Sequence, residues 1–259
     1  MLSIKCPGSN ATLTAYLLNS NAKGTVLICP GGAYRFTSPR EAAPVAIAFN
    51  RGGYNAFVLD YTTCTTLAAP LGKRPLADVA WAMAYIRENA EKYALNPDKI
   101  ALCGFSAGGH LAGSLGVYWH NPEFFGGNKP SEFYRPNALI LCYAVLSPGV
   151  FGHSESFYNL AGNDDHRQWA IDSLVSPNTP PTFLWHTASD ASVPVQNSLL
   201  VAEKLAAYKI PFELHVFPNG SHGLSLATQE VNQPEQGRLA NPHVAQWISL
   251  CINWLDITI

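Results

Sequence analysis

The stretch Lys99-Ile-Ala-Leu-Cys-Gly-Phe-Ser-Ala-Gly-Gly-His-Leu-Ala112 decides the fold. The apolar run from Ile100 to Cys103 predicts a buried strand, and the small residues from Ala107 onward predict a helix. Ser106 lies at the junction, inside the pattern G-x-S-x-G. This pattern needs glycine two residues before and after the serine, because larger side chains would collide with neighbouring backbone in so sharp a turn. It predicts a nucleophile elbow, with the Ser106 hydroxyl held clear of the sheet beside a helix N-terminus.

The composition indicates a large core and argues against strongly charged partners. A chain of 259 residues with 47% hydrophobic residues predicts a single domain over 1–259, in which an insertion at about 147–181 forms a minimal cap. A net charge of −2 and the lack of any Lys/Arg cluster argue against nucleic acid or an anionic membrane as partner. With only 13% charged residues, the surface leaves room for a subunit interface and hence for a homo-oligomer.

The termini and cysteines favour a soluble, cytoplasmic protein. Residues 1–8 have neither a long apolar core nor a small-residue cleavage site, so no signal peptide is expected. No uninterrupted apolar stretch approaches membrane-spanning length. The six cysteines form no C-x-x-C pair and most lie in apolar runs, which favours buried free thiols over disulfides or a metal site. No metal and no other cofactor is expected.

Apolar runs and helical periodicities alternate along the chain. The predicted strands cover 12–18 (as an edge strand), 25–29, 55–61, 100–103, 138–144, 182–187 and 212–217. The predicted helices cover 42–50, 76–86, the segment from 107, 199–208 and 247–255. Residues 19–24 predict a turn, and 224–242 predict a polar loop. The alternation indicates the α/β class, with a mostly parallel sheet covered by helices on both faces.

A nucleophilic serine needs a base, and the base needs an acid that orients it. In a parallel sheet both come from loops at the carboxyl ends of strands. Of the eight histidines, His222 lies in a glycine-rich loop after the last predicted strand, and Asp190 directly follows the 182–187 strand. The chain order Ser106, Asp190, His222 is that of an α/β-hydrolase triad. A helix N-cap is the alternative role for Asp190, and His110 on the elbow helix is expected to be structural.

Backbone amides are the expected donors to an oxyanion. Ala107 follows the nucleophile and offers one N–H, while the turn after the 25–29 strand offers the other through Gly32 or Ala33. Aromatic residues near strand ends are candidates for a substrate pocket, although core packing is the alternative. They are Tyr34, Phe105, Tyr158 and Trp185.

Four segments together resemble the α/β-hydrolase superfamily, specifically its small acetyl-esterase and acetylxylan-esterase-like (BD-FAE-like) members near the hormone-sensitive-lipase group. The segments are 30–34, 104–110, 180–190 and 221–223. The resemblance implies Ser106, Asp190 and His222 as the triad and Gly32 with Ala107 as the oxyanion hole. Pro30 stands where the usual HGG motif has histidine, and Ala33 stands where it has a third glycine. Both changes keep the backbone amides and leave open which one donates.

The resemblance implies a serine carboxylesterase that hydrolyses short acyl esters, with acetyl esters of carbohydrates or small alcohols as its small-molecule substrates. The insertion at 147–181 is shorter than the caps of true lipases, which favours small acyl groups. An amidase or peptidase-like hydrolase, such as an arylformamidase or a prolyl-peptidase-like module, would use the same triad and remains an alternative. A binding protein on a retired hydrolase fold would have lost a catalytic residue, whereas all three are present.

Overall fold

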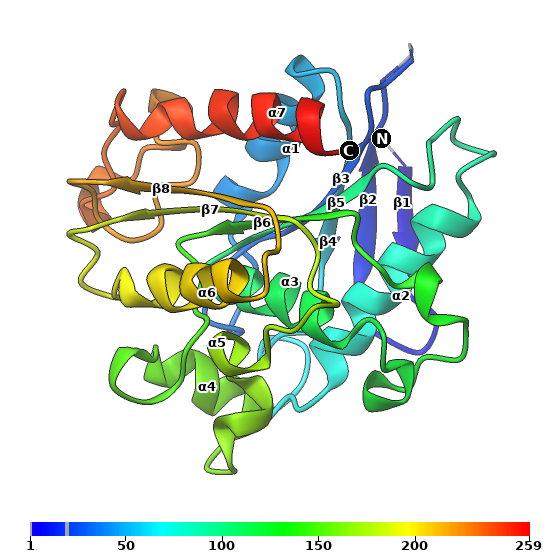
Figure 1. The fold of residues 1–259 in the computed structure, drawn as a ribbon, viewed down its shortest axis with the longest axis horizontal. Coiled ribbons are helices and arrows are strands. Elements are labelled where there is room, and N and C mark those ends of the chain that lie inside the picture. Colours follow the sequence, from blue (N-terminus) through cyan, green and yellow to red (C-terminus); the bar gives the residue numbers. More distant parts are fainter. Residues whose placement is uncertain (1, 19–20) are drawn as a thin grey trace.

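An eight-stranded sheet forms the centre of the computed structural model, which describes residues 2–18 and 21–259 (Figure 1). The strand order is β1-β2-β4-β3-β5-β6-β7-β8. β2 pairs antiparallel with both of its neighbours, and all pairs from β4 to β8 are parallel. The strands are β1 (Leu2–Lys5), β2 (Thr12–Tyr16), β3 (Thr25–Cys29), β4 (Asn55–Asp60), β5 (Ile100–Phe105), β6 (Ala138–Cys142), β7 (Thr182–Thr187) and β8 (Phe212–Phe217).

Helices cover both faces of this sheet, as Figure 1 shows. α1 and α7 lie over one face, and α2, α3 and α6 lie over the other. The central strands β3, β5, β6 and β7 are buried along their whole length, which is why they appear in the sequence as continuous apolar runs. The helices are α1 (Ala43–Arg51), α2 (Arg74–Glu88), α3 (Ala107–Tyr118), α4 (Ser154–Ala161), α5 (Ile171–Leu174), α6 (Gln196–Ala207) and α7 (Trp247–Thr258).

The prediction of the α/β class, with a mostly parallel sheet covered by helices on both faces, is therefore confirmed. The prediction that the 12–18 strand forms the edge is wrong, because β1 pairs with β2 on its outer side. Three of the four β1 residues are exposed, so the strand is too short and too open to give a clear pattern. The turn predicted over 19–24 begins at Asn19 and Ser20, which lie outside the described residues.

Two segments outside the sheet bring residues to its carboxyl edge. The insertion, residues 147–181, carries α4, α5 and two short 3-10 turns, at Gly149–Phe151 and His166–Trp169. The C-terminal loop, residues 224–242, holds two more 3-10 turns, at Gln229–Val231 and Pro234–Gln236. This loop is not merely polar: its apolar side chains pack into the core beneath α7, namely Leu224, Leu226, Ala227 and Val231.

No helix in ranges 2–18 and 21–259 is long and apolar enough to span a bilayer.

Candidate active site

The turn between β5 and α3 is as sharp as the sequence pattern requires. Ser106 has φ 52° and ψ −118°, a conformation that non-glycine residues rarely adopt. A Cβ on Gly104 would lie 2.1 Å from the Gly108 carbonyl oxygen, and a Cβ on Gly108 would lie 2.1 Å from the Cys29 carbonyl oxygen. Both glycines are needed because backbone occupies the space that a side chain would fill.

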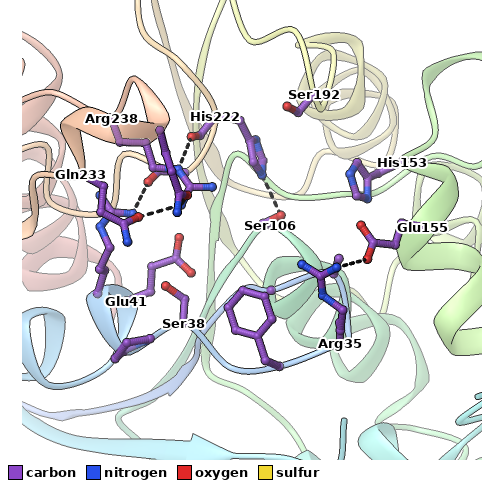
Figure 2. Close-up of a pocket in the computed structure, with 17 residues that line it drawn as sticks. Arg35, Ser38, Glu41, Ser106, His153, Glu155, Ser192, His222, Gln233 and Arg238 are labelled. Atoms are coloured by element: carbon purple, nitrogen blue, oxygen red, sulfur yellow. Dashed lines mark hydrogen bonds and ion pairs between the residues drawn. The ribbon is translucent and has the colours of Figure 1, made fainter. Parts of the chain in front are cut away.

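The structure brings Ser106, His222 and Asp190 together from three separate loops. Figure 2 shows the contact between Ser106 and His222. Ser106 Oγ lies 2.8 Å from His222 Nε2, and His222 Nδ1 lies 2.7 Å from Asp190 Oδ2. Since a carboxylate only accepts, Nδ1 carries the ring proton and Nε2 can accept the serine proton. These loops follow β5, β8 and β7, so the site lies at the carboxyl edge of the parallel strands.

Asp190 is buried and held by several donors. Its Oδ1 accepts the backbone N–H groups of Ser192 and Val193, both at 2.9 Å, so it also caps the turn that follows. Its Oδ2 lies 3.5 Å from His186 Nε2. Burial alone would raise the pKa of Asp190, but the contacts with His186 and His222 hold it well below the usual range. The carboxylate therefore stays ionised while it orients His222.

The glycine turn, residues 30–34, passes next to Ser106 in a left-handed backbone conformation. Gly32, Ala33 and Tyr34 have φ values of 131°, 55° and 59°. A Cβ on Gly32 would lie 2.1 Å from the Phe36 carbonyl oxygen, so this position requires glycine. The Gly31 N–H donates to Glu41 Oε2 at 2.7 Å and is therefore not available as a donor to a ligand. Within the described part of the chain, the amides of Gly32, Ala33 and Ala107 donate no hydrogen bond.

A cavity of about 370 Å³ opens around Ser106 and His222. One side is formed by the residues that follow the glycine turn, a second by the insertion and a third by the C-terminal loop, as Figure 2 shows. The polar side chains that line it are Arg35, Ser38, Arg40, Glu41, His153, Glu155, Ser192, Gln233, Gln236 and Arg238. Sequence patterns did not single out these residues, since polar side chains in irregular loops follow no periodicity.

The contacts of two arginines, Arg35 and Arg238, fix the sides of this cavity. Arg35 forms an ion pair with Glu155 at 3.3 Å, which joins the segment after the glycine turn to the insertion. On the other side, Arg238 Nη1 donates to the side-chain oxygens of Gln233 and Gln236, at 2.9 and 2.7 Å. Arg238 Nε donates to the backbone oxygen of His222 at 3.2 Å. The C-terminal loop is thus tied to His222, the residue that contacts Ser106.

His153 presents an N–H group on the insertion side of the cavity. Its Nδ1 accepts the Ser156 backbone N–H at 3.3 Å, which caps α4, so the neutral ring carries its proton on Nε2. Burial and the nearby His222 lower the pKa of His153. This histidine therefore stays neutral and can offer Nε2–H to a ligand.

The structure corrects the predicted aromatic pocket. Tyr34, Phe105 and Trp185 are at most 1% exposed and belong to the two cores beside the sheet, as the core-packing alternative expected. Phe105, for example, packs edge to face on Trp247. Tyr158 is 56% exposed, but it lines a different hollow between the start of the insertion and the end of α4. Position near a strand end does not determine which face a side chain takes.

No group of three His, Cys, Asp or Glu side chains gathers at a candidate metal site among residues 2–18 and 21–259. Each of the six cysteines is free; five are buried and Cys64 is partly exposed.

Comparison with known proteins assigns the family. The sequence matches the BD-FAE family over residues 16–143. An acetyl ester-xyloside bifunctional hydrolase from Caldicellulosiruptor lactoaceticus is 35% identical with a TM-score of 0.83, over 96% of this chain and 89% of that one. The chain belongs to the BD-FAE family of α/β-hydrolases. A sugar hydrolase from Lactococcus lactis is similar at 32% identity and a TM-score of 0.82, over 99% of this chain and 97% of that one.

Longer curated proteins also contain a segment similar to this chain. Endo-1,4-beta-xylanase B from Butyrivibrio fibrisolvens is 40% identical over 84% of this chain but 35% of its own length. The acetylxylan esterase of Xylanibacter ruminicola is 28% identical over 82% of this chain and 43% of its own length. The chain thus spans less than half the length of these two relatives.

Proposed function

We propose that this protein is a serine carboxylesterase that removes short acyl groups, acetyl above all, from carbohydrates or other small alcohols. One observation carries the proposal: the continuous hydrogen-bond chain from Ser106 through His222 to Asp190 opens into a polar cavity. Serine, histidine and carboxylate in this order and geometry form the machinery of acyl transfer.

The reaction follows from the positions of these atoms. His222 Nε2 takes the Ser106 proton while Oγ attacks the ester carbonyl carbon, and the carbonyl oxygen becomes an oxyanion. The free amides of Ala107 and of Gly32 or Ala33 would hold this oxyanion, each worth roughly 3 kcal/mol of barrier. His222 then gives its proton to the departing alkoxide, which leaves as the alcohol. A water molecule, deprotonated by His222, attacks the acyl-enzyme; the bond to Ser106 Oγ breaks, Oγ takes the proton back from His222, and the acid is released.

The cavity supports a polar alcohol and a small acyl group. Its side-chain lining is dominated by charged, amide and hydroxyl groups, with Phe36 and Pro39 as the larger apolar contributors. Hydroxyl groups of a sugar can exchange hydrogen bonds with such a lining, whereas a long acyl chain needs an apolar channel. The relatives named for acetylxylan and acetyl ester-xyloside point in the same direction.

Free cysteines support a reducing compartment for this reaction. Five of the six thiols are buried and none is paired. We therefore propose a cytoplasmic location, where small acetylated sugars are the substrates.

The test is hydrolysis of p-nitrophenyl esters from acetyl to octanoyl, together with acetylated xylo-oligosaccharides, by the protein and by Ser106→Ala. We expect a steep fall beyond butanoyl, acetate release from the sugars and no activity in Ser106→Ala. Full activity in Ser106→Ala would overturn the mechanism. No ester hydrolysis, with Ser106 still labelled by a fluorophosphonate, would replace the esterase with an amidase that uses the same triad.

A further inference from the structure

His110 is a buried histidine that the proposed reaction does not use. It lies on α3, one turn after Ser106, and its backbone N–H donates to the Ser106 carbonyl at 3.0 Å. Its side chain is 1% exposed and does not line the cavity. Its Nδ1 lies 2.7 Å from the Tyr34 hydroxyl, and its Nε2 lies 2.9 Å from the Trp169 carbonyl oxygen. The ring thus joins the glycine turn, the elbow helix and the insertion.

The partners of His110 fix its tautomer. The Trp169 carbonyl only accepts, so Nε2 carries the proton and Nδ1 has a free lone pair. The Tyr34 hydroxyl then donates to Nδ1. Burial lowers the pKa of His110 to about 4, with the Trp169 carbonyl acting in the opposite direction, so the ring is neutral near pH 7. Edge-to-face contacts with Tyr34 and Phe157 hold its plane.

The segment held by this ring is the strained part of the glycine turn. Ala33 and Tyr34 are consecutive non-glycine residues with positive φ, a conformation that persists only where surrounding contacts impose it. The Ala33 carbonyl accepts from Asn159 Nδ2 of α4 at 2.8 Å, and the Tyr34 carbonyl accepts the Cys64 N–H at 2.9 Å. The Tyr34 side chain supplies a hydrogen bond that connects the turn directly to α3, the helix that follows Ser106.

We propose that Tyr34 and His110 are positioning residues: the hydrogen-bonded chain Tyr34–His110–Trp169 holds the Gly32 and Ala33 amides at the distance from Ser106 that an oxyanion requires. This inference rests on the proposed function, because it assigns those amides to the oxyanion. A positioning role differs from a purely packing role for His110. Loss of the Tyr34–His110–Trp169 hydrogen bonds would raise the energy of the transition state more than that of the bound substrate.

Three variants separate these roles. Tyr34→Phe removes only the hydroxyl. His110→Asn keeps an acceptor near the position of Nδ1 and loses the donor to Trp169, whereas His110→Gln keeps a donor near Nε2 and loses the acceptor for Tyr34. The matched control is Tyr54→Phe, which deletes a hydroxyl bonded to Asp256 at 2.8 Å on a tyrosine that is equally buried and lies outside the cavity lining.

With p-nitrophenyl acetate we expect Tyr34→Phe and His110→Gln to lose about tenfold to hundredfold in kcat with little change in KM. His110→Asn should retain more activity than His110→Gln, and the double variant Tyr34→Phe/His110→Gln should be no worse than His110→Gln alone. The melting temperature should fall more in Tyr34→Phe than in Tyr54→Phe, because His110 Nδ1 is left unpaired in the core whereas Asp256 is partly exposed and can bond to water.

The inference is overturned if Tyr34→Phe keeps the kcat of Tyr54→Phe, or if His110→Gln is as active as His110→Asn. Should Tyr34→Phe fail to fold, the two His110 variants decide the question by the same comparison. The proposed function fails separately, when wild type hydrolyses no ester or Ser106→Ala remains active. In that case, the rates at which a fluorophosphonate labels Ser106 in the same variants still test the positioning role.

Discussion

The Tyr143 hydroxyl donates a hydrogen bond of 2.5 Å to Glu41 Oε1, and both side chains are buried. The other oxygen of Glu41 accepts the Gly31 N–H at 2.7 Å, while the Tyr143 oxygen accepts the Ser225 N–H at 2.9 Å. The Tyr143 ring also packs edge to face on His222, with 5.1 Å between ring centroids. One carboxylate and one phenol therefore connect the glycine turn to the loop that follows the candidate base.

Replacing Tyr143 with phenylalanine leaves one oxygen of Glu41 and the Ser225 N–H without partners in a buried site. We expect a loss of roughly 1–3 kcal/mol in the free energy of unfolding. Esterase kcat should fall as well, because the hydrogen bonds that connect Gly31, through Glu41, to the loop after His222 are lost. Urea unfolding and p-nitrophenyl acetate kinetics measure the two effects. Tyr118→Phe, which deletes an exposed hydrogen bond to Gln168, should change both much less, and equal losses in the two variants would contradict the prediction.

Acid should destabilise the protein through His110. Its folded pKa is about 4 against an ordinary value of 6.5, so between these values the unfolded state binds more protons than the folded state. Stability therefore falls as pH drops from 6.5 to 4, by roughly 3 kcal/mol in total, and levels off below that. The contribution of Asp190, whose folded pKa is also lowered, is constant above about pH 5 and is lost progressively at lower pH. Urea unfolding from pH 7 to pH 4.5 should show a steeper decline for wild type than for His110→Asn, and parallel declines would refute the assignment.

Asp190→Asn should nearly abolish catalysis without unfolding the protein. An asparagine can turn its N–H₂ toward His222 Nδ1, which moves the ring proton to Nε2 and removes the acceptor for the Ser106 proton. A change of this kind costs about 10⁴-fold in kcat in a serine protease. Steady-state kinetics at pH 7.5 measure the loss. The control is Ser192→Ala, which keeps the backbone N–H that Asp190 accepts and should retain most of the activity.

Gly108→Ala tests the packing of the elbow helix. The new methyl group would lie 2.1 Å from the Cys29 carbonyl and 2.3 Å from the Pro30 carbonyl, and backbone cannot move aside as a side chain can. We expect a loss of about 3 kcal/mol or more, together with the loss of activity. Gly113→Ala on the same helix meets the Ile171 side chain at 3.2 Å and should be tolerated. A folded, active Gly108→Ala protein would contradict this prediction, because it would show that α3 can move away from the end of β3.

Gln233→Ala tests recognition of the alcohol. Arg238 occupies the side-chain oxygen of Gln233, so its amide N–H groups remain for a ligand. We expect kcat/KM for acetylated xylo-oligosaccharides to fall about tenfold, with p-nitrophenyl acetate unaffected. Gln229→Ala, in the same loop but outside the cavity lining, is the control. Equal effects on both substrates would exclude a specific contact with the sugar.

Local patterns predicted much of the scaffold. Three strands have the predicted bounds, Thr25–Cys29, Thr182–Thr187 and Phe212–Phe217, because glycine, proline and polar residues mark their ends. The positions of Asp190 and His222 next to Ser106 followed from chain order and from the rule that such loops share one edge of a parallel sheet. Their catalytic roles, and those of Gly32, Ala33 and Ala107, stay predictions that the variants above test.

The remaining parts of the site depend on contacts between distant segments. Glu155 and Arg35 are far apart in the sequence, and so are Arg40 and Val231, whose carbonyl the guanidinium binds at 2.7 Å. No local periodicity in the sequence predicts which distant residues will form such pairs. The buried pair Tyr34 and His110 illustrates the same limit, since an aromatic residue in a glycine turn gives no sign of its direction.

The contact of Arg238 with the His222 carbonyl has a consequence for evolvability. The side of the cavity formed by the C-terminal loop can accept new residues at Gln233 and Gln236 while the sheet and elbow are preserved. Arg238 cannot be exchanged as freely, because it also supports the backbone of the candidate base. Selection for a new alcohol should therefore change the two glutamines first and retain the arginine.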